Sequence, residues 1–164
     1  MKSSSIFTRA LFAFFLVLAP TSVFAGDIMI QNAWIREMPQ GAEVAAGYLE
    51  IMNHGTEPDR LVAVEAPGAM NSMLHEMTID DSGVMRMRAL EGGITIAPGE
   101  TAILAPGGNH LMIMGVQEPY APHSDVEITL TFEKAGDIKA AFFVGNHARA
   151  GHDATHSQDM NHDE

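Results

Sequence analysis

Apolar and polar residues alternate over short stretches of this chain, and turn residues separate the stretches. The run DVEITLTF shows the pattern, with Val126, Ile128, Leu130 and Phe132 at every second position. Side chains two residues apart in an extended strand share one face, so this run predicts a strand with one buried face. No segment beyond residue 25 carries a long apolar stripe at helical spacing. The alternation therefore favours an all-β fold.

Turn motifs divide the chain into nine expected strands. Gly, Pro, Asn and Asp cluster in breaks such as NHGTEPD, DDSG and APGE, and these residues supply the backbone conformations that turns require. The expected strands are Ile28–Ile35, Val44–Met52, Arg60–Ala66, Ser72–Ile79, Val84–Leu90, Thr101–Ala105, His110–Val116, Asp125–Phe132 and Ile138–Val144. Short strands at this spacing predict an antiparallel sandwich or barrel.

The N-terminal segment does not belong to this pattern. Lys2 and Arg9 flank the start of the apolar run ALFAFFLVLAP, and the small-residue site VFA follows it. These features predict a secretory signal peptide over residues 1–25, cleaved near Ala25. No other apolar run approaches the length that spans a membrane. We therefore expect an exported chain whose body is one domain, residues 26–145.

The C-terminal segment, residues 146–164, also differs from the body. It has no apolar period and places four histidines and one methionine among acidic and small residues. Such a composition cannot build a core and is associated with metal binding. The sequence therefore predicts a disordered, histidine-rich tail that begins near His147.

Charge and cysteine content exclude several classes of function. The chain has 21 acidic and 9 basic residues, a formal net charge of −12, and so no electrostatic reason to bind nucleic acid or anionic lipid. It has no cysteine, which excludes disulfides, iron–sulfur clusters, cysteine zinc sites and blue-copper centres. Twelve methionines and eight histidines remain as soft and borderline metal ligands.

Three expected strands carry histidine and methionine at every second position. The same-face sets are Met73, His75 and Met77 in MLHEM, Met85 and Met87 in VMRMR, and His110, Met112 and Met114 in HLMIM. Neutral thioethers suit Cu(I), and imidazole adds affinity. Each methionine alone is more often core filler, so a structural sandwich without metal remains an alternative. The joint pattern nevertheless favours a copper site.

The same stretches resemble the periplasmic copper chaperones of the PCuAC type. The family signature is a histidine, a methionine about a dozen residues later, and His-x-Met some twenty residues further. Here His75, Met87 and His110-x-Met112 follow that order. The segments SGVMRMR, PGGNHLMIM, AAGYLEIMNHG and ITLTFEKAGDI also look like the family's strands. The resemblance covers residues 32–144.

The resemblance implies a cupredoxin-like Greek-key sandwich with one Cu(I) site. The implied ligands are His75, Met87, His110 and Met112. Met85 competes with Met87 because both lie on one strand face, while Met77 and Met114 would line the site. The tail looks like the His/Met-rich extension of some family members and would bind Cu(II).

The implied function is that of a monomeric periplasmic carrier and not of an enzyme. Its acceptor would be the CuA centre of cytochrome c oxidase, reached directly or through a thiol-bearing assembly factor. An electron-transfer cupredoxin is a second alternative, against which the missing cysteine argues.

Overall fold

The computed structural model of the 164-residue chain describes residues 26–148. Ten strands make up its regular structure: β1 (Ile28–Arg36), β2 (Val44–Asn53), β3 (Asp59–Glu65), β4 (Asn71–Ile79), β5 (Met85–Ala89), β6 (Ile94–Ile96), β7 (Thr101–Leu104), β8 (His110–Met114), β9 (Asp125–Phe132) and β10 (Gly136–Gly145). Within this range no helix is long and apolar enough to cross a membrane. The predicted signal peptide and most of the predicted tail lie outside the described residues.

Nine of the ten strands coincide with expected ones, and β6 is the addition. Its three residues, Ile-Thr-Ile, are too few for alternation to be recognised in the sequence. Gly93 makes the turn before β6 with a φ of 72°, and a Cβ there would lie 2.2 Å from the Leu61 carbonyl oxygen. Glycine is therefore required at this turn.

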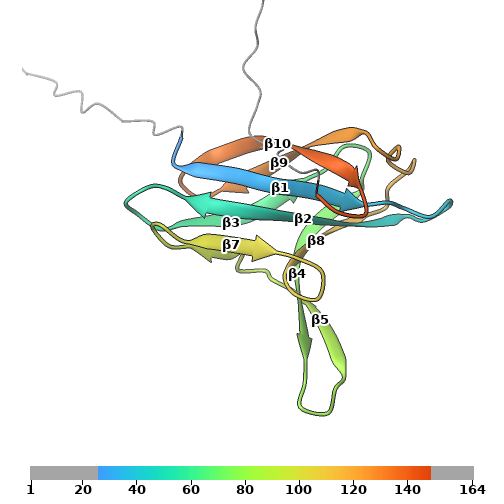
Figure 1. Cartoon of the computed structure of the whole chain (residues 1–164), viewed down its shortest axis with the longest axis horizontal. Coiled ribbons are helices and arrows are strands. Elements are labelled where there is room, and N and C mark those ends of the chain that lie inside the picture. Colours follow the sequence, from blue (N-terminus) through green and yellow to red (C-terminus); the bar gives the residue numbers. More distant parts are fainter. Residues whose placement is uncertain (1–25, 149–164) are drawn as a thin grey trace, which may run out of the picture.

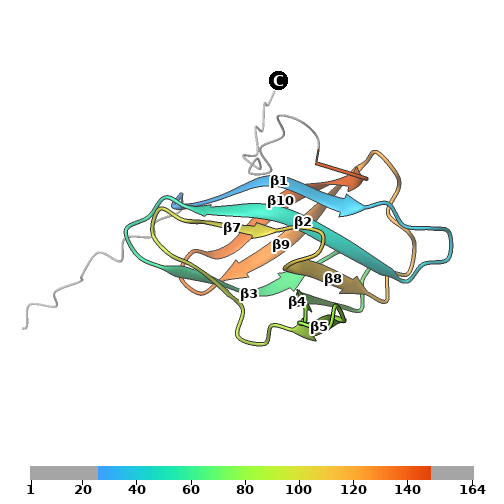
Figure 2. The same ribbon diagram turned by 60° about the horizontal axis from the view of Figure 1, so that its bottom comes forward.

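The strands form one hydrogen-bonded sheet that folds over on itself (Figures 1 and 2). The order is β5-β4-β8-β2-β1-β10-β9-β3-β6, with β7 also paired to β2. Contacts of β3 with β4 and of β6 with β7 close the two layers around the core. All pairings are antiparallel except that of β1 with β10, which is parallel. The expected all-β sandwich is confirmed, with this one parallel pair in it.

Aliphatic and phenylalanine side chains fill the core. The face predicted for β9 is buried as expected, with Val126, Ile128, Leu130 and Phe132 all inside. None of the core residues in the described part of the chain is a methionine. The methionines of β4, β5 and β8 therefore do not act as core filler, and their alternation needs another explanation.

A bulge in β1 sets which of its residues face outward. The register with β2 shifts between Gln31 and Trp34, and Asn32 there has a φ of 51°. An extra residue of this kind keeps apolar side chains pointing inward on both sides of the bulge. As a result Ile30 and Ile35 are fully buried, while Trp34 lies on the outer face.

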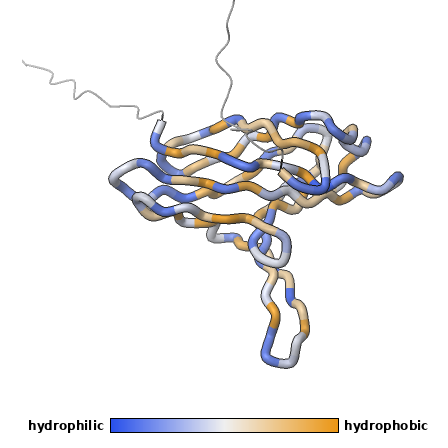
Figure 3. The backbone as a smooth tube through the Cα atoms, in the orientation of Figure 1, coloured by the Kyte–Doolittle hydropathy of each residue, from blue (hydrophilic) through white to orange (hydrophobic). Residues whose placement is uncertain are grey.

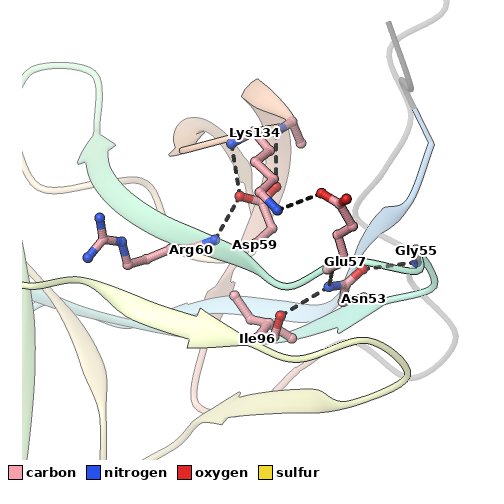
Figure 4. Close-up of polar contacts among 8 residues, drawn as sticks. Asn53, Gly55, Glu57, Asp59, Arg60, Ile96 and Lys134 are labelled. Carbon is pink, nitrogen blue, oxygen red and sulfur yellow. Dashed lines mark hydrogen bonds and ion pairs between the residues drawn. The ribbon is translucent and has the colours of Figure 1, made fainter. Parts of the chain in front are cut away.

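Buried polar groups fix the end of the sandwich where β2 stops (Figure 4). The Asp59 carboxylate accepts hydrogen bonds from the backbone N–H groups of Arg60, Lys134 and Ala135 at 2.7, 2.9 and 2.9 Å. The Asn53 amide donates to the carbonyl oxygens of Glu57 and Ile96. Because every partner is satisfied, this network has a structural role.

Strands β4 and β5 extend away from the body as a hairpin. β8 pairs only with Asn71–His75 of β4, so residues 76–89, here called the projecting hairpin, continue beyond it. Figure 1 shows the hairpin pointing away from the sandwich, and Figure 3 shows hydrophobic segments along it. All five residues of β5 are exposed. Burial therefore does not explain the alternation in this strand.

Candidate metal centre

The sheet register brings the predicted histidines and methionines onto one outer face. β4 lies between β5 and β8, so side chains from three strands become neighbours. His75 is opposite His110, and Met73 is opposite Met112. On the other side of β4, Met87 is opposite Met77. Directly opposed residues on one face of a sheet have their Cβ atoms about 5 Å apart, so these side chains can interact.

The two histidines form the centre of this group. Their ring centroids are 5.9 Å apart, with the rings nearly edge to face. His110 is buried, with 5% of its surface exposed, and its Nδ1 lies 2.9 Å from the Gly108 carbonyl oxygen. A carbonyl only accepts, so Nδ1 carries the proton and Nε2 keeps a free lone pair. This tautomer is the one in which His110 can bind a metal through Nε2.

His75 lacks such a partner. Its Nδ1 is buried and makes no hydrogen bond within the described part of the chain. Burial, and secondarily the nearby His110, lowers the pKa of His75 below its usual 6.5. The neutral imidazole is therefore favoured, which is the form that binds metal. A neutral imidazole with a buried nitrogen that no protein group satisfies, beside a second histidine, fits the role of a metal ligand.

A cavity of about 240 Å³ opens beside His110, and His75 is not among the residues that line it. Met87, His110 and Met112 line it together with the segment from Arg36 to Pro39. Met85 does not line it, because Met85 is opposite Ile79, one pair further along the hairpin. The register thus separates the two methionines that the sequence left in competition. Met87 lines the same cavity as His110, and Met85 lies further out on the hairpin.

An aromatic group lies next to His110, and the spacing of the candidate ligands in the sequence did not indicate it. Trp34 and Tyr48 stack with ring centroids 4.5 Å apart, and Tyr48 lies 6.5 Å from the His110 ring. The Arg36 guanidinium covers Tyr48 at 5.6 Å. The bulge in β1 decides this placement, and a bulge is not readable from alternation alone. The group screens one side of His110 from water.

The donor set on this face is neutral and soft. Two imidazoles and several thioethers share this face, and Glu76 is on the opposite face, where it pairs with Arg88. Among residues 26–148, no group of three or more His, Cys, Asp or Glu is placed to hold a metal. This face therefore does not provide a carboxylate-rich site for Mg²⁺ or Ca²⁺. Thioether with imidazole suits Cu(I).

Two other histidines of the body take no part in this group. His54 and His123 are exposed in turns, as expected from the sequence. Met114 lies on the same face as Met112, opposite Asn71, at the edge of the group. Of the tail, only the segment to residue 148 is described, so the histidines beyond His147 that are predicted to bind Cu(II) lie outside the described residues.

Comparison with known proteins gives a family match over nearly the whole body. The family described as "Putative lipoprotein LpqE-like" matches residues 28–144. The chain is also 31% identical over 108 residues to "Putative lipoprotein Lxx21020" of Leifsonia xyli subsp. xyli. That alignment takes in 66% of this chain and 63% of the relative, so the chain spans less than two thirds of the relative's length.

Solved structures of PCuAC domains share the fold. The copper-bound PCuAC domain from PmoF2 is 26% identical, with a TM-score of 0.63 over 74% of this chain and 94% of that one. The solution structure of CuI-DR1885 from Deinococcus radiodurans is 26% identical, with a TM-score of 0.54 over 77% of this chain and 83% of that one.

Proposed function

Because the chain belongs to the LpqE-like family and has the fold of PCuAC domains, we propose that it is a carrier of Cu(I). The observation that carries the proposal is the position of the methionines. They line an exposed face beside two histidines, whereas the core is built without them. Solvent-facing thioethers have no packing role to fulfil, and their softness matches Cu(I). Two similar domains have been solved in a copper-bound and a Cu(I)-bound form.

The proposed ligands are His75, Met87, His110 and Met112. His110 is the anchor, since its ring is buried and its tautomer is fixed by Gly108. His75 contributes a neutral imidazole across the strand pair, and Met112 follows His110 by two residues on the same face. Met87 closes the site from the hairpin and is 49% exposed. Met77 and Met114 flank the four ligands.

Exposure differs between the ligands and suggests how copper leaves. A neutral thioether binds Cu(I) less strongly than a thiolate does, so an acceptor thiolate can displace one methionine at a time. Met87 is the most accessible of the four and His110 the least, so an acceptor thiolate reaches the copper from the hairpin side. The metal keeps its oxidation state, one Cu–S bond forms for each bond that breaks, and no reductant is needed. The protein therefore acts as a carrier and not as an enzyme.

The acceptor and the compartment are part of the proposal. We expect delivery to a copper-enzyme assembly pathway, either the CuA subunit of cytochrome c oxidase or a thiol-bearing assembly factor. The chain would work in the periplasm as a monomer after removal of residues 1–25. The lipoprotein descriptions of its family and relative support export. The tail from His147 onward would take up Cu(II) in addition.

An electron-transfer role receives no support from the site. A blue-copper centre needs a thiolate ligand, and the chain has no cysteine. The Cu(II) form of the strand site should therefore lack intense visible absorption.

The test is a Cu(I) competition titration of the whole chain against a chromogenic Cu(I) chelator. His110→Ala and Met112→Ala should each lower the affinity by roughly tenfold or more, since loss even of a residue supporting a ligand costs about 10–100-fold. Met29→Ala removes a sulfur from the far end of the sandwich, where Met29 pairs with Met52, and should change nothing. Wild-type affinity in both site variants would refute the assignment.

A further inference from the structure

The projecting hairpin carries more sulfur than the proposed site uses. Met77 and Met85 lie on the same face as Met87 but outside the four proposed ligands. Met85 is 64% exposed, and its neighbour across the strand pair, Ile79, is exposed as well. The body reaches the base of this face, where Met77 is half-buried and Met87 lines the cavity, whereas the outer pair of Met85 and Ile79 is exposed. Core packing therefore does not explain why methionine occurs at every second position on this face.

Three thioethers on this face are close enough to share one ion. Met77 and Met87 are directly opposite each other, and Met85 is the next residue on the same face of β5. Directly opposed Cβ atoms are about 5 Å apart and diagonal ones about 7–8 Å, within reach of long side chains. Methionine has three rotatable side-chain bonds, so the three sulfurs can turn toward a common point.

The opposite face of the hairpin holds its charges away from the sulfurs. Arg86 pairs with Asp80 at 3.0 Å, and Arg88 pairs with Glu76 at 2.6 Å. Asp80 also accepts the backbone N–H groups of Ser82 and Val84, which fixes the turn. The arginines, which would repel a cation, are thus neutralised and face the other way. What remains on the sulfur face is a neutral and soft surface.

We propose that Met77, Met85 and Met87 form a second Cu(I) site, made of thioethers alone. The inference rests on the proposed function, because it takes Cu(I) as the cargo. Met87 belongs to both sites, so copper can move outward while this ligand stays bound. The bonds to the histidines and Met112 break, and bonds to Met77 and Met85 form, with no change of oxidation state. The hairpin then offers copper at the point that projects furthest toward an acceptor.

The first experiment removes the histidine site and asks what remains. In the whole chain carrying His75→Ala and His110→Ala, Cu(I) binding should persist at an affinity at least tenfold below wild type. Adding Met77→Leu and Met85→Leu to that variant should remove the Cu(I) binding that remains. Leucine keeps the volume of an exposed methionine without its sulfur, so the fold is conserved. The matched control is Met29→Leu with Met52→Leu, which removes two paired sulfurs of β1 and β2.

The second measurement needs no substitution. Wild-type chain labelled with ¹³C at the methionine methyl groups is titrated with Cu(I), and the Met77 and Met85 signals should shift together with that of Met87 as copper exchanges between the two sites. Unchanged Cu(I) binding in the Met77/Met85 variant, or an equal loss in the control, would overturn the hairpin site. The face would then be an apolar docking surface only. If His75→Ala with His110→Ala leaves the affinity at its wild-type value, the proposed function itself fails, which is a separate result.

Discussion

Substituting the two histidines separately should change the stability of the metal-free protein in opposite directions. His75 has a buried Nδ1 with no hydrogen-bond partner, whereas the Nδ1 of His110 donates to Gly108. An unsatisfied buried polar atom costs about 1–3 kcal/mol, and replacing it by an apolar group of similar shape removes that cost. We therefore expect His75→Leu to stabilise the metal-free fold and His110→Leu to destabilise it.

The structure sets the size of both effects. His75 is only partly buried, so its gain belongs at the lower end of the range, about 1 kcal/mol. The Gly108 carbonyl also accepts the Met77 N–H at 3.3 Å, so His110→Leu leaves it with one partner and costs about 1 kcal/mol. For a domain of this length, each kcal/mol corresponds to roughly 4 °C in Tm. The two variants should thus differ by about 8 °C.

Urea denaturation with a chelator present measures these changes at pH 7.5. His75→Leu should raise the midpoint with an unchanged m value, yet lose the stabilisation that Cu(I) gives the wild type. If His75→Leu lowers stability as much as His110→Leu does, then Nδ1 of His75 has a partner, and the site is not poised for a metal. The same outcome would remove the physical basis for His75 as a ligand.

Five further outcomes follow from the structure. The pKa of His75 is lower in the folded than in the unfolded protein, so the unfolded chain takes up a proton first as the pH falls. The stability of the wild type should therefore decrease at pH values below about 6.5, and the advantage of His75→Leu should grow there. Denaturation at pH 7.5 and at pH 5.5 measures both changes. Protons also compete with copper for imidazole, so Cu(I) affinity should decline over the same acid range, and a flat competition titration down to pH 4 would contradict histidine ligation. Met87→Leu should weaken Cu(I) binding about tenfold and more than Met85→Leu, and the reverse order would assign the wrong methionine. Truncation after Val144 should remove most Cu(II) uptake and leave Cu(I) binding and the melting temperature unchanged, as calorimetry would show. Asp59→Ala should cost about 3 kcal/mol, since three backbone N–H groups lose their acceptor, without altering Cu(I) affinity in the folded protein.

The alternation of apolar and polar residues was sufficient to predict nine of the strands, because the inward face of a strand buries every second side chain. It was insufficient for β6, where three residues carry too little pattern. It also could not locate the bulge at Asn32, because one additional residue shifts the inward set without changing composition. The stack of Trp34 on Tyr48 depends on that shift and was therefore missed.

The candidate site was predictable in its residue types but not in its arrangement. The two-residue period of a strand predicted that His110 and Met112 share one face, and the turn between β4 and β5 indicated that these strands are neighbours. Only the pairing of Met87 with Met77 and of Met85 with Ile79 separates the two competing methionines. Strand register depends on long-range contacts, which a single sequence does not reveal. The four ligands remain a prediction that binding experiments must test.

The one parallel strand pair determines where the described chain enters and leaves the sandwich. β1 begins beside Asn53, in the end fixed by Asp59, whereas β10 finishes beside Arg36, with the Glu37 N–H donating to the Gly145 carbonyl. Arg36 and Glu37 line the cavity that Met87 and His110 share. A tether fused ahead of residue 26 would thus hold the molecule by its far end and leave the histidine face free. A segment fused after residue 148 would start close to this cavity. It would compete for space there with a docking protein, and any metal-binding side chains that it carried would be held near the site at high effective concentration.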